Sequence, residues 1–229
     1  MYGLDGMLVK TLQQQIQHIY QLPQDLSIED FLINPGTVDT LKEKQCVLPS
    51  IAPHKGYMLL FTEDDELHVG IYLHNNVIDN LRRYNPLLGL HEKNIYDFCI
   101  MTEEVSHFLY TTWKARHDIQ MTKLEIELQA EVDKFILCSL YRAHHQDKTN
   151  GLPLIDLLFE GYHFEENLSE ESKTRYHTAS RLARHYCHFL DRHYINDNHI
   201  PQMIEEIRQF YRFSQTDKIS HINRTSLYH

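Results

Sequence analysis

HEKNIYDFCIMTEEVSHFLYTTWKARHDIQMTKLEIELQAEVDKFILCSLYRAHH, residues 91–145, lies inside the longest stretch of the chain that contains neither glycine nor proline. Its apolar residues recur with the period of an α-helix, and the segment RHDIQ at 116–120 interrupts that period. The stretch therefore predicts two long helices, at about 91–116 and 122–145, that pack as an antiparallel pair.

A β-hairpin is predicted just before the helical pair. The segments YMLLF at 57–61 and LHVGIYL at 67–73 are joined by the acidic turn TEDDE, and the second segment alternates apolar residues with His68, Gly70 and Tyr72. An isolated hairpin is unstable in water, so helices are expected to cover its apolar face. The sequence thus predicts a mostly α-helical α+β fold, with a small β-hairpin or antiparallel sheet packed on a helical bundle.

The length favours one domain spanning residues 1–229, because a chain of this size buries a sufficient core by itself. Within that domain we expect a helical N-terminal part at 1–46, the β-hairpin at 57–73, the long helical pair at 91–145 and C-terminal helices at 170–217.

The composition is acidic and rich in histidine. With 22 basic and 32 acidic residues the formal net charge is -10, which makes nucleic acid an unlikely partner. No apolar run approaches the roughly 20 residues that cross a bilayer, so no membrane span is expected. The first residues lack a secretory core, and widely spaced cysteines are typical of reduced thiols. A cytoplasmic location is therefore expected for a chain whose four cysteines are Cys46, Cys99, Cys138 and Cys187.

The segment TEEVSHF at 102–108 places two carboxylates and an imidazole within one helical turn. Glu103 lies four residues before His107, and Glu104 lies three residues before it. Winding this helix at 100° per residue puts Glu104 on the flank of the apolar stripe, while Glu103 and His107 lie nearly opposite that stripe. His107 must therefore either face water or line a second covered face of the helix.

A Glu-x-x-His pair on a helix is suited to binding a metal ion. Residues 103–131 resemble the helix pair of the gluzincin metallopeptidases, in which a His-Glu-x-x-His helix is followed by a helix that carries a glutamate ligand. The resemblance implies zinc, with Glu103 in place of the first histidine ligand and His107 as the second ligand. It further implies Glu104 as the catalytic base and Glu127 or Glu131 as the third ligand. Candidate metal ligands are therefore Glu103, Glu104, His107, Glu127 and Glu131, and the function predicted is a zincin-like hydrolase site.

Two alternatives remain open on the sequence alone. A helical di-iron oxygenase would use the same Glu-x-x-His pair together with His185 or His188. A non-enzymatic interaction or scaffold protein would bind a protein partner and no metal, with its charged helical faces solvated. Glu125 lies on the apolar side of the second helix but is not counted among the candidate ligands. The segment TKLE at 122–125 has the capping-box pattern, in which Thr122 and Glu125 cap a helix start.

Overall fold

The computed structural model describes residues 4–34, 55–63, 66–145, 153–160 and 169–226. Within them the protein is mostly helical and contains a two-stranded antiparallel sheet, as the sequence predicts. The strands are β1, Gly56–Glu63, and β2, Glu66–Leu73. The helical elements are α1 (Leu4–Tyr20), η1 (Ile28–Phe31), α3 (Asn75–Arg83), η2 (Pro86–Leu88), α4 (Ile95–Arg116), α5 (Lys123–His145), α6 (Leu154–Phe159), α7 (Glu170–Leu190), η3 (Asp191–Ile195), α8 (Ile200–Arg212) and α9 (Gln215–Ser226).

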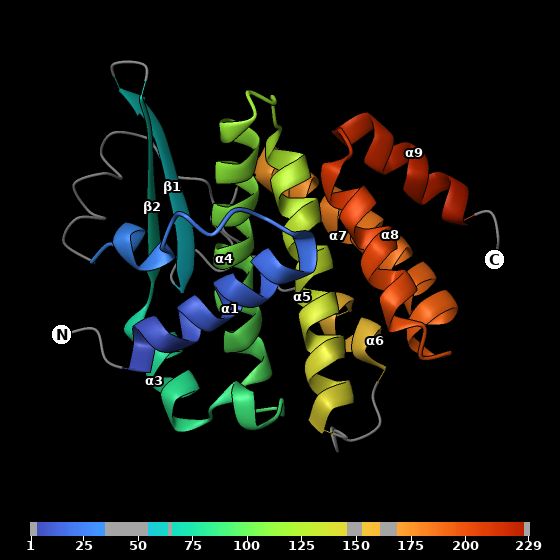
Figure 1. Cartoon of the computed structure of the whole chain (residues 1–229), viewed down its shortest axis with the longest axis horizontal. Helices are drawn as coiled ribbons and strands as arrows, with labels where there is room; N and C mark the ends of the chain where they lie inside the picture. The colour runs from blue at the N-terminus through green and yellow to red at the C-terminus, as the bar shows by residue number, and fades with distance from the viewer. Residues whose placement is uncertain (1–3, 35–54, 64–65, 146–152, 161–168, 227–229) are drawn as a thin grey trace.

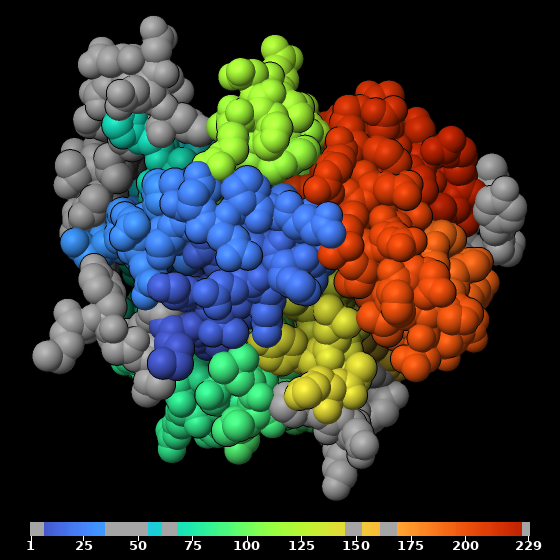
Figure 2. Space-filling model, viewed as in Figure 1, coloured from blue at the N-terminus to red at the C-terminus, as the bar shows by residue number. Residues whose placement is uncertain are grey.

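The two long helices stand at the centre of the molecule. Figure 1 shows α4 between the hairpin and α5, and α5 between α4 and α7, with α8 and α9 beyond α7. Helix α1 crosses in front of α4 and α5, and in Figure 2 the N-terminal segment, in blue, covers the middle of this face. Both helices of the predicted pair are therefore covered on more than one side.

The hairpin is covered on its apolar face by helices, as the alternation of its residues predicts. Its strands pair in register from Gly56 opposite Leu73 to Glu63 opposite Glu66. Met58 and Ile71 point into the main core. The other face buries Tyr57 and Tyr72, whose rings stack with centroids 4.9 Å apart.

The structure also differs from the predicted elements. Helices α3 and α6 are not among them, because both are short. The C-terminal helical region continues beyond residue 217 to Ser226, because Lys218 and Ile222 of α9 are fully buried against the core. Of the predicted helical part at 1–46, residues 1–3 and 35–46 lie outside the described residues.

The start of α5 confirms the predicted capping box. The backbone N–H of Thr122 donates to Glu125 Oε2 at 3.1 Å, and the backbone N–H of Glu125 donates to Thr122 Oγ1 at 3.1 Å. Glu125 is also buried beside Lys114 of α4, with Lys114 Nζ 3.0 Å from Glu125 Oε1. Thr122 Oγ1 further contacts Gln215 at the start of α9, so the cap links three helices.

A buried polar network surrounds Asp133 of α5. Asp133 accepts hydrogen bonds from Tyr20 of α1 at 2.5 Å and from Ser106 of α4 at 2.5 Å. Gln129 also donates to Asp133, at 2.9 Å, and accepts from Lys218 of α9 at 2.6 Å. Because all five side chains are buried, the network joins four helices through groups that would be costly to leave unpaired.

No helix among the described residues is both long and apolar enough to cross a membrane. Three cysteines are described, and all three are free thiols. The sulfur atoms of Cys99 and Cys138 lie 3.8 Å apart across the α4–α5 interface. Cys46 lies outside the described residues.

The cap at Thr122 is expected to stabilise the fold measurably. Thr122→Ala removes the side-chain acceptor for the Glu125 N–H, so the free energy of unfolding should fall by about 1 kcal/mol. Thr178→Ala is a matched control, because its hydroxyl donates to Thr174 O within the turn of α7 that contains both residues. Urea unfolding followed by circular dichroism checks both variants, and equal losses would contradict the capping role.

Stability should depend on pH through Asp133. Burial raises the pKa of Asp133 from its ordinary 3.8 to about 6, although hydrogen bonds from Ser106, Tyr20 and Gln129 oppose the rise. The folded protein then holds this proton at pH values where the unfolded chain has lost it, so stability falls as pH rises through that window. A rise of this size corresponds to about 3 kcal/mol.

Asp133→Asn removes the titrating group and isolates that contribution. The free energy of unfolding of the wild type, minus that of Asp133→Asn, should fall by about 2.4 kcal/mol between pH 4 and pH 7. Urea titrations of both proteins across this range measure the difference. A difference that stays constant or grows with pH would disprove the raised pKa.

Candidate metal centre

All five predicted metal ligands are buried and gather at the α4–α5 interface. Glu103, Glu104, His107, Glu127 and Glu131 each expose 5% or less of their surface. His107 therefore lines a second covered face of α4 and does not face water. This face packs against α5, and α5 packs in turn against α7.

The donor atoms of Glu103, His107 and Glu127 converge. One donor atom from each lies within 4.8 Å of the other two. His107 Nε2 is 3.4 Å from Glu127 Oε2 on α5. On the other side of the ring, His107 Nδ1 is 3.6 Å from Glu104 Oε2. Both distances are longer than an ordinary hydrogen bond, so the imidazole lies between two carboxylates without bonding tightly to either.

Lys134 occupies the end of the cluster that is formed by Glu103 and Glu131. Its Nζ lies 3.0 Å from Glu103 Oε2 and 2.8 Å from Glu131 Oε1. The pairing of Glu131 with Lys134 is the structural alternative to metal binding at that residue. Glu103 is thus shared, because it belongs both to this ion pair and to the group of three converging donors.

Helix α7 adds two residues that were not predicted. Arg175 places Nε 4.0 Å from Glu127 Oε1. Burial raises the pKa of Tyr176, and the nearby charges of Glu127 and Glu103 raise it further. Tyr176 is the first large apolar side chain of the buried stripe of α7. This stripe is the sequence signal that places this part of the helix in the interior.

His185 and His188 do not join the cluster. Both lie on the exposed side of α7, whereas the residues between them, Tyr186 and Cys187, are buried. The predicted di-iron alternative therefore lacks the second histidine on which it depended.

The hairpin closes the site over Glu104. A Cβ atom added to Gly56, at the start of β1, would lie 3.1 Å from Glu104 Cγ and 3.2 Å from Glu104 Oε1. Only a residue without a side chain lets the strand approach α4 this closely. The same contact leaves both oxygens of Glu104 fully buried with no hydrogen-bond partner, and His107 Nε2 is buried without one as well.

Burial and the charges of neighbouring groups shift the pKa values of Glu104 and His107. Burial raises the pKa of Glu104 to about 7, although His107 opposes the rise. Burial alone would lower the pKa of His107, but the Glu104 and Glu127 carboxylates outweigh that effect and hold it well above the ordinary value. Near neutral pH, Glu104 and His107 therefore hold protons between them, and a bound cation would displace protons from the site.

One imidazole nitrogen with two carboxylate oxygens is a donor set that zinc accepts, and iron or manganese can use it too. Three protein ligands leave a coordination position open, as in catalytic zinc sites. His107 Nε2, which is buried without a hydrogen-bond partner, fits such an ion, since a bound cation would satisfy it.

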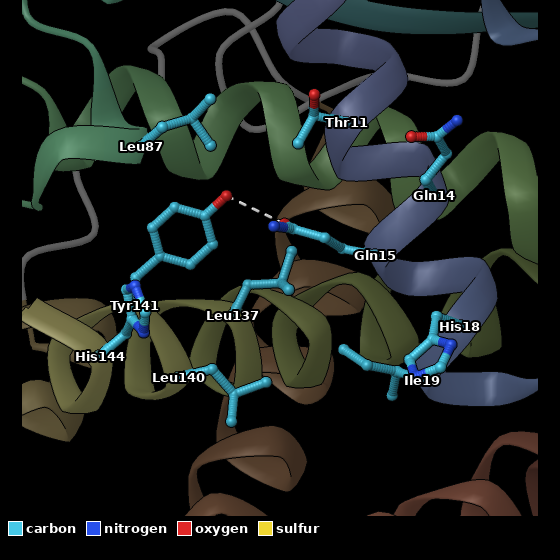
Figure 3. A pocket seen from close by; sticks show the side chains of 10 residues that line it. All are labelled: Thr11, Gln14, Gln15, His18, Ile19, Leu87, Leu137, Leu140, Tyr141 and His144. Carbon is cyan, nitrogen blue, oxygen red and sulfur yellow. Dashed lines mark hydrogen bonds between the residues drawn. The ribbon is translucent and has the colours of Figure 1, made fainter.

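A separate groove of about 600 Å³ lies between α1 and α5 (Figure 3). Leu137 and Leu140 line it from α5, and the Tyr141 hydroxyl donates across it to Gln15 Oε1 at 2.9 Å. None of the predicted metal ligands lines the groove. Its amide, imidazole and aliphatic lining offers no carboxylate, so the groove and the buried cluster are chemically distinct.

Comparisons of the chain with protein-family models, with curated proteins and with solved structures found no match. What the cluster does is therefore inferred from its own residues.

Proposed function

We propose that the protein binds one zinc ion between α4 and α5, through Glu103, His107 and Glu127, and uses it for hydrolysis. The observation that carries the proposal is the convergence of three donor atoms within 4.8 Å of one another. Two ligands on one tetrahedral zinc, at about 2.0 to 2.2 Å from the ion, are separated by roughly 3.3 to 3.6 Å. The 3.4 Å between His107 Nε2 and Glu127 Oε2 falls in that range.

Charge balance supports a bound cation. Among the described residues of the cluster, four glutamates face Lys134, Arg175 and the imidazole of His107, whose pKa is raised, so one negative charge is left over when all four glutamates are ionised. Burying an excess of negative charge is costly unless a cation compensates it. A divalent ion supplies that compensation and also gives His107 Nε2 the partner it lacks.

In this proposal Glu104 positions His107. Its carboxylate faces Nδ1, whereas Nε2 faces Glu127. A carboxylate on the second ring nitrogen of a metal-bound histidine fixes the orientation and tautomer of the ring. The gluzincin resemblance gives Glu104 the role of general base instead, and the geometry favours the positioning role.

Hydrolysis is the chemistry that an open zinc position supplies best. Zinc lowers the pKa of a bound water to about 7 and so provides a nucleophile at neutral pH. The similarity of residues 103–131 to the gluzincin helix pair supports this reaction class. Arg175 lies beside Glu127, where a guanidinium can hold an anionic group of a substrate.

A second candidate is a purely structural charge network, as in the predicted interaction or scaffold protein. It is favoured by the two short contacts of Lys134, which compensate Glu103 and Glu131 without any metal. Under this candidate no zinc binds, and His107 serves only to separate Glu104 from Glu127.

Metal analysis separates the two candidates. Protein purified without an affinity tag and dialysed against Zn²⁺ should hold about one zinc per chain, and His107→Ala should hold none, because the nitrogen donor is gone. His185→Ala is the matched control, since it removes an exposed histidine of α7 and should keep the metal. A metal-free wild type, or a His107→Ala variant that binds zinc like the wild type, would refute the proposal.

The roles of the carboxylates are separated by isosteric variants. Glu104→Gln should weaken zinc binding about 10- to 100-fold, because it disturbs a partner of the ligand and leaves the ligands in place. Glu127→Gln should weaken zinc binding more strongly, because it replaces a ligand. Competition titrations with a zinc chelator measure both constants, and the reverse order would instead make Glu104 the ligand.

A further inference from the structure

We propose that Cys99 and Cys138 form a redox-active thiol pair, which a hydroperoxide oxidises to a disulfide between α4 and α5. The primary observation is the contact of the two sulfur atoms, which lie 3.8 Å apart across the interface of these helices. Both residues are free thiols in the structure. This inference concerns a covalent modification and does not depend on the proposed zinc site.

The packing of α4 against α5 holds the thiol pair in place. One turn from the pair on each helix, Glu103 of α4 and Lys134 of α5 form an ion pair, with Glu103 Oε2 3.0 Å from Lys134 Nζ. On the other side of the pair, the ring of Tyr141 packs on that of Phe98, with centroids 5.0 Å apart. Because these contacts fix the antiparallel register of the two helices, they also bring the two sulfur atoms together.

A disulfide can close from this arrangement with a small movement. An S–S bond is about 2.05 Å long, so the two sulfur atoms must approach each other by roughly 1.8 Å. Rotation about the side-chain torsions and small shifts of the two helices can share this movement. The thiols therefore touch in the reduced form and bond only after oxidation.

The two thiols differ in their exposure, which assigns them different roles. Cys99 is half-buried, whereas Cys138 is fully buried. The hydrogen bond with Cys99 and burial raise the pKa of Cys138 well above its ordinary value, so Cys138 stays protonated in the reduced protein. Redox-sensor cysteines are accessible to solvent and often lie beside a resolving cysteine. Cys99 is therefore the thiol that meets the oxidant, and Cys138 is the resolving thiol.

The oxidation consists of two balanced steps, written here for hydrogen peroxide. The Cys99 thiolate attacks one peroxide oxygen, the O–O bond breaks, and Cys99 becomes a sulfenic acid while the departing hydroxide takes up a proton as water. The Cys138 sulfur then attacks the Cys99 sulfur, the S–O bond breaks, and the departing hydroxide combines with the Cys138 proton as a second water. The two thiols together lose two electrons and two protons, which the peroxide receives.

Cys187 of α7 provides a matched control. It is fully buried, as Cys138 is, and it lies outside the α4–α5 thiol pair. Burial raises the pKa of Cys187 well above its ordinary value. A buried thiol of this kind is inert toward oxidants, so Cys187 should keep its thiol while the pair is oxidised.

Peptide mapping tests the inference on the full-length chain. Trypsin cleaves after lysine and arginine, which places Cys99 and Cys138 in separate peptides, 94–114 and 135–142. After treatment with one equivalent of hydrogen peroxide, mass spectrometry without reductant should find these two peptides joined, and dithiothreitol should separate them. Cys187→Ser should give the same joined peptides, and Cys99→Ser should not.

A second measurement tests the order of the two steps. In Cys138→Ser the resolving thiol is gone, so the sulfenic acid of Cys99 should accumulate and be trapped by dimedone. In Cys99→Ser the buried Cys138 should remain unlabelled. Circular dichroism checks that each variant is folded, and Cys138→Ala replaces Cys138→Ser if that variant does not fold.

Two results would overturn the inference. If the two peptides stay separate in the oxidised wild type, or if Cys99 is joined to any other cysteine peptide, the contact in the structure is not a redox pair. If dimedone labels Cys138 in Cys99→Ser as readily as it labels Cys99 in Cys138→Ser, the assigned roles of the two thiols are wrong. Neither result affects the proposed zinc site.

Discussion

Charged side chains buried along α5 impose one constraint on the helices packed around it. Every residue from Glu125 to Ser139 is buried, and this run contains three glutamates, an aspartate and a lysine. A buried charge that lacks a partner costs several kcal/mol, so the neighbouring helices must present compensating groups. Lys114 of α4, Lys218 of α9 and Arg175 of α7 supply them.

Helical winding divides these polar groups into two sets with different properties. At 100° per residue, Glu125, Gln129 and Asp133 fall on one side of α5, while Glu127, Glu131 and Lys134 fall on nearly the opposite side. The first set is joined to its neighbours by hydrogen bonds of ordinary length or shorter. The second set faces His107 and Glu104 of α4, which leave a buried imidazole nitrogen and two carboxylate oxygens without hydrogen-bond partners. This unfilled bonding capacity marks the second side as the functional candidate.

The sequence predicts what depends on neighbours along the chain. The long helical pair follows from the lack of helix breakers, the hairpin from alternation, and the Thr122–Glu125 cap from its spacing. Glu103, Glu104 and His107 could also be named as candidates, because they share a helical turn, whereas Glu127 and Glu131 were named from the gluzincin resemblance. Packing between distant segments could not be predicted: Gly56 covers Glu104 and Arg175 approaches Glu127 only because strand and helix meet in space. The packing of α4 against α5 likewise decides that Nδ1 of His107 faces Glu104 and Nε2 faces Glu127.

The same constraint explains why a metal at this site would serve chemistry and not folding. Small zinc domains need four protein ligands because the ion replaces a hydrophobic core. Here the core extends from Leu8 of α1 to Ile222 of α9 and consists of apolar residues, none of which belongs to the polar cluster. Lys134 already compensates part of its negative charge. An ion that is not required for folding, and that is held by three ligands from two rigid helices, keeps one coordination position for a water or a substrate. In the proposed function, the charges that make α5 costly to bury would therefore also hold the catalytic metal.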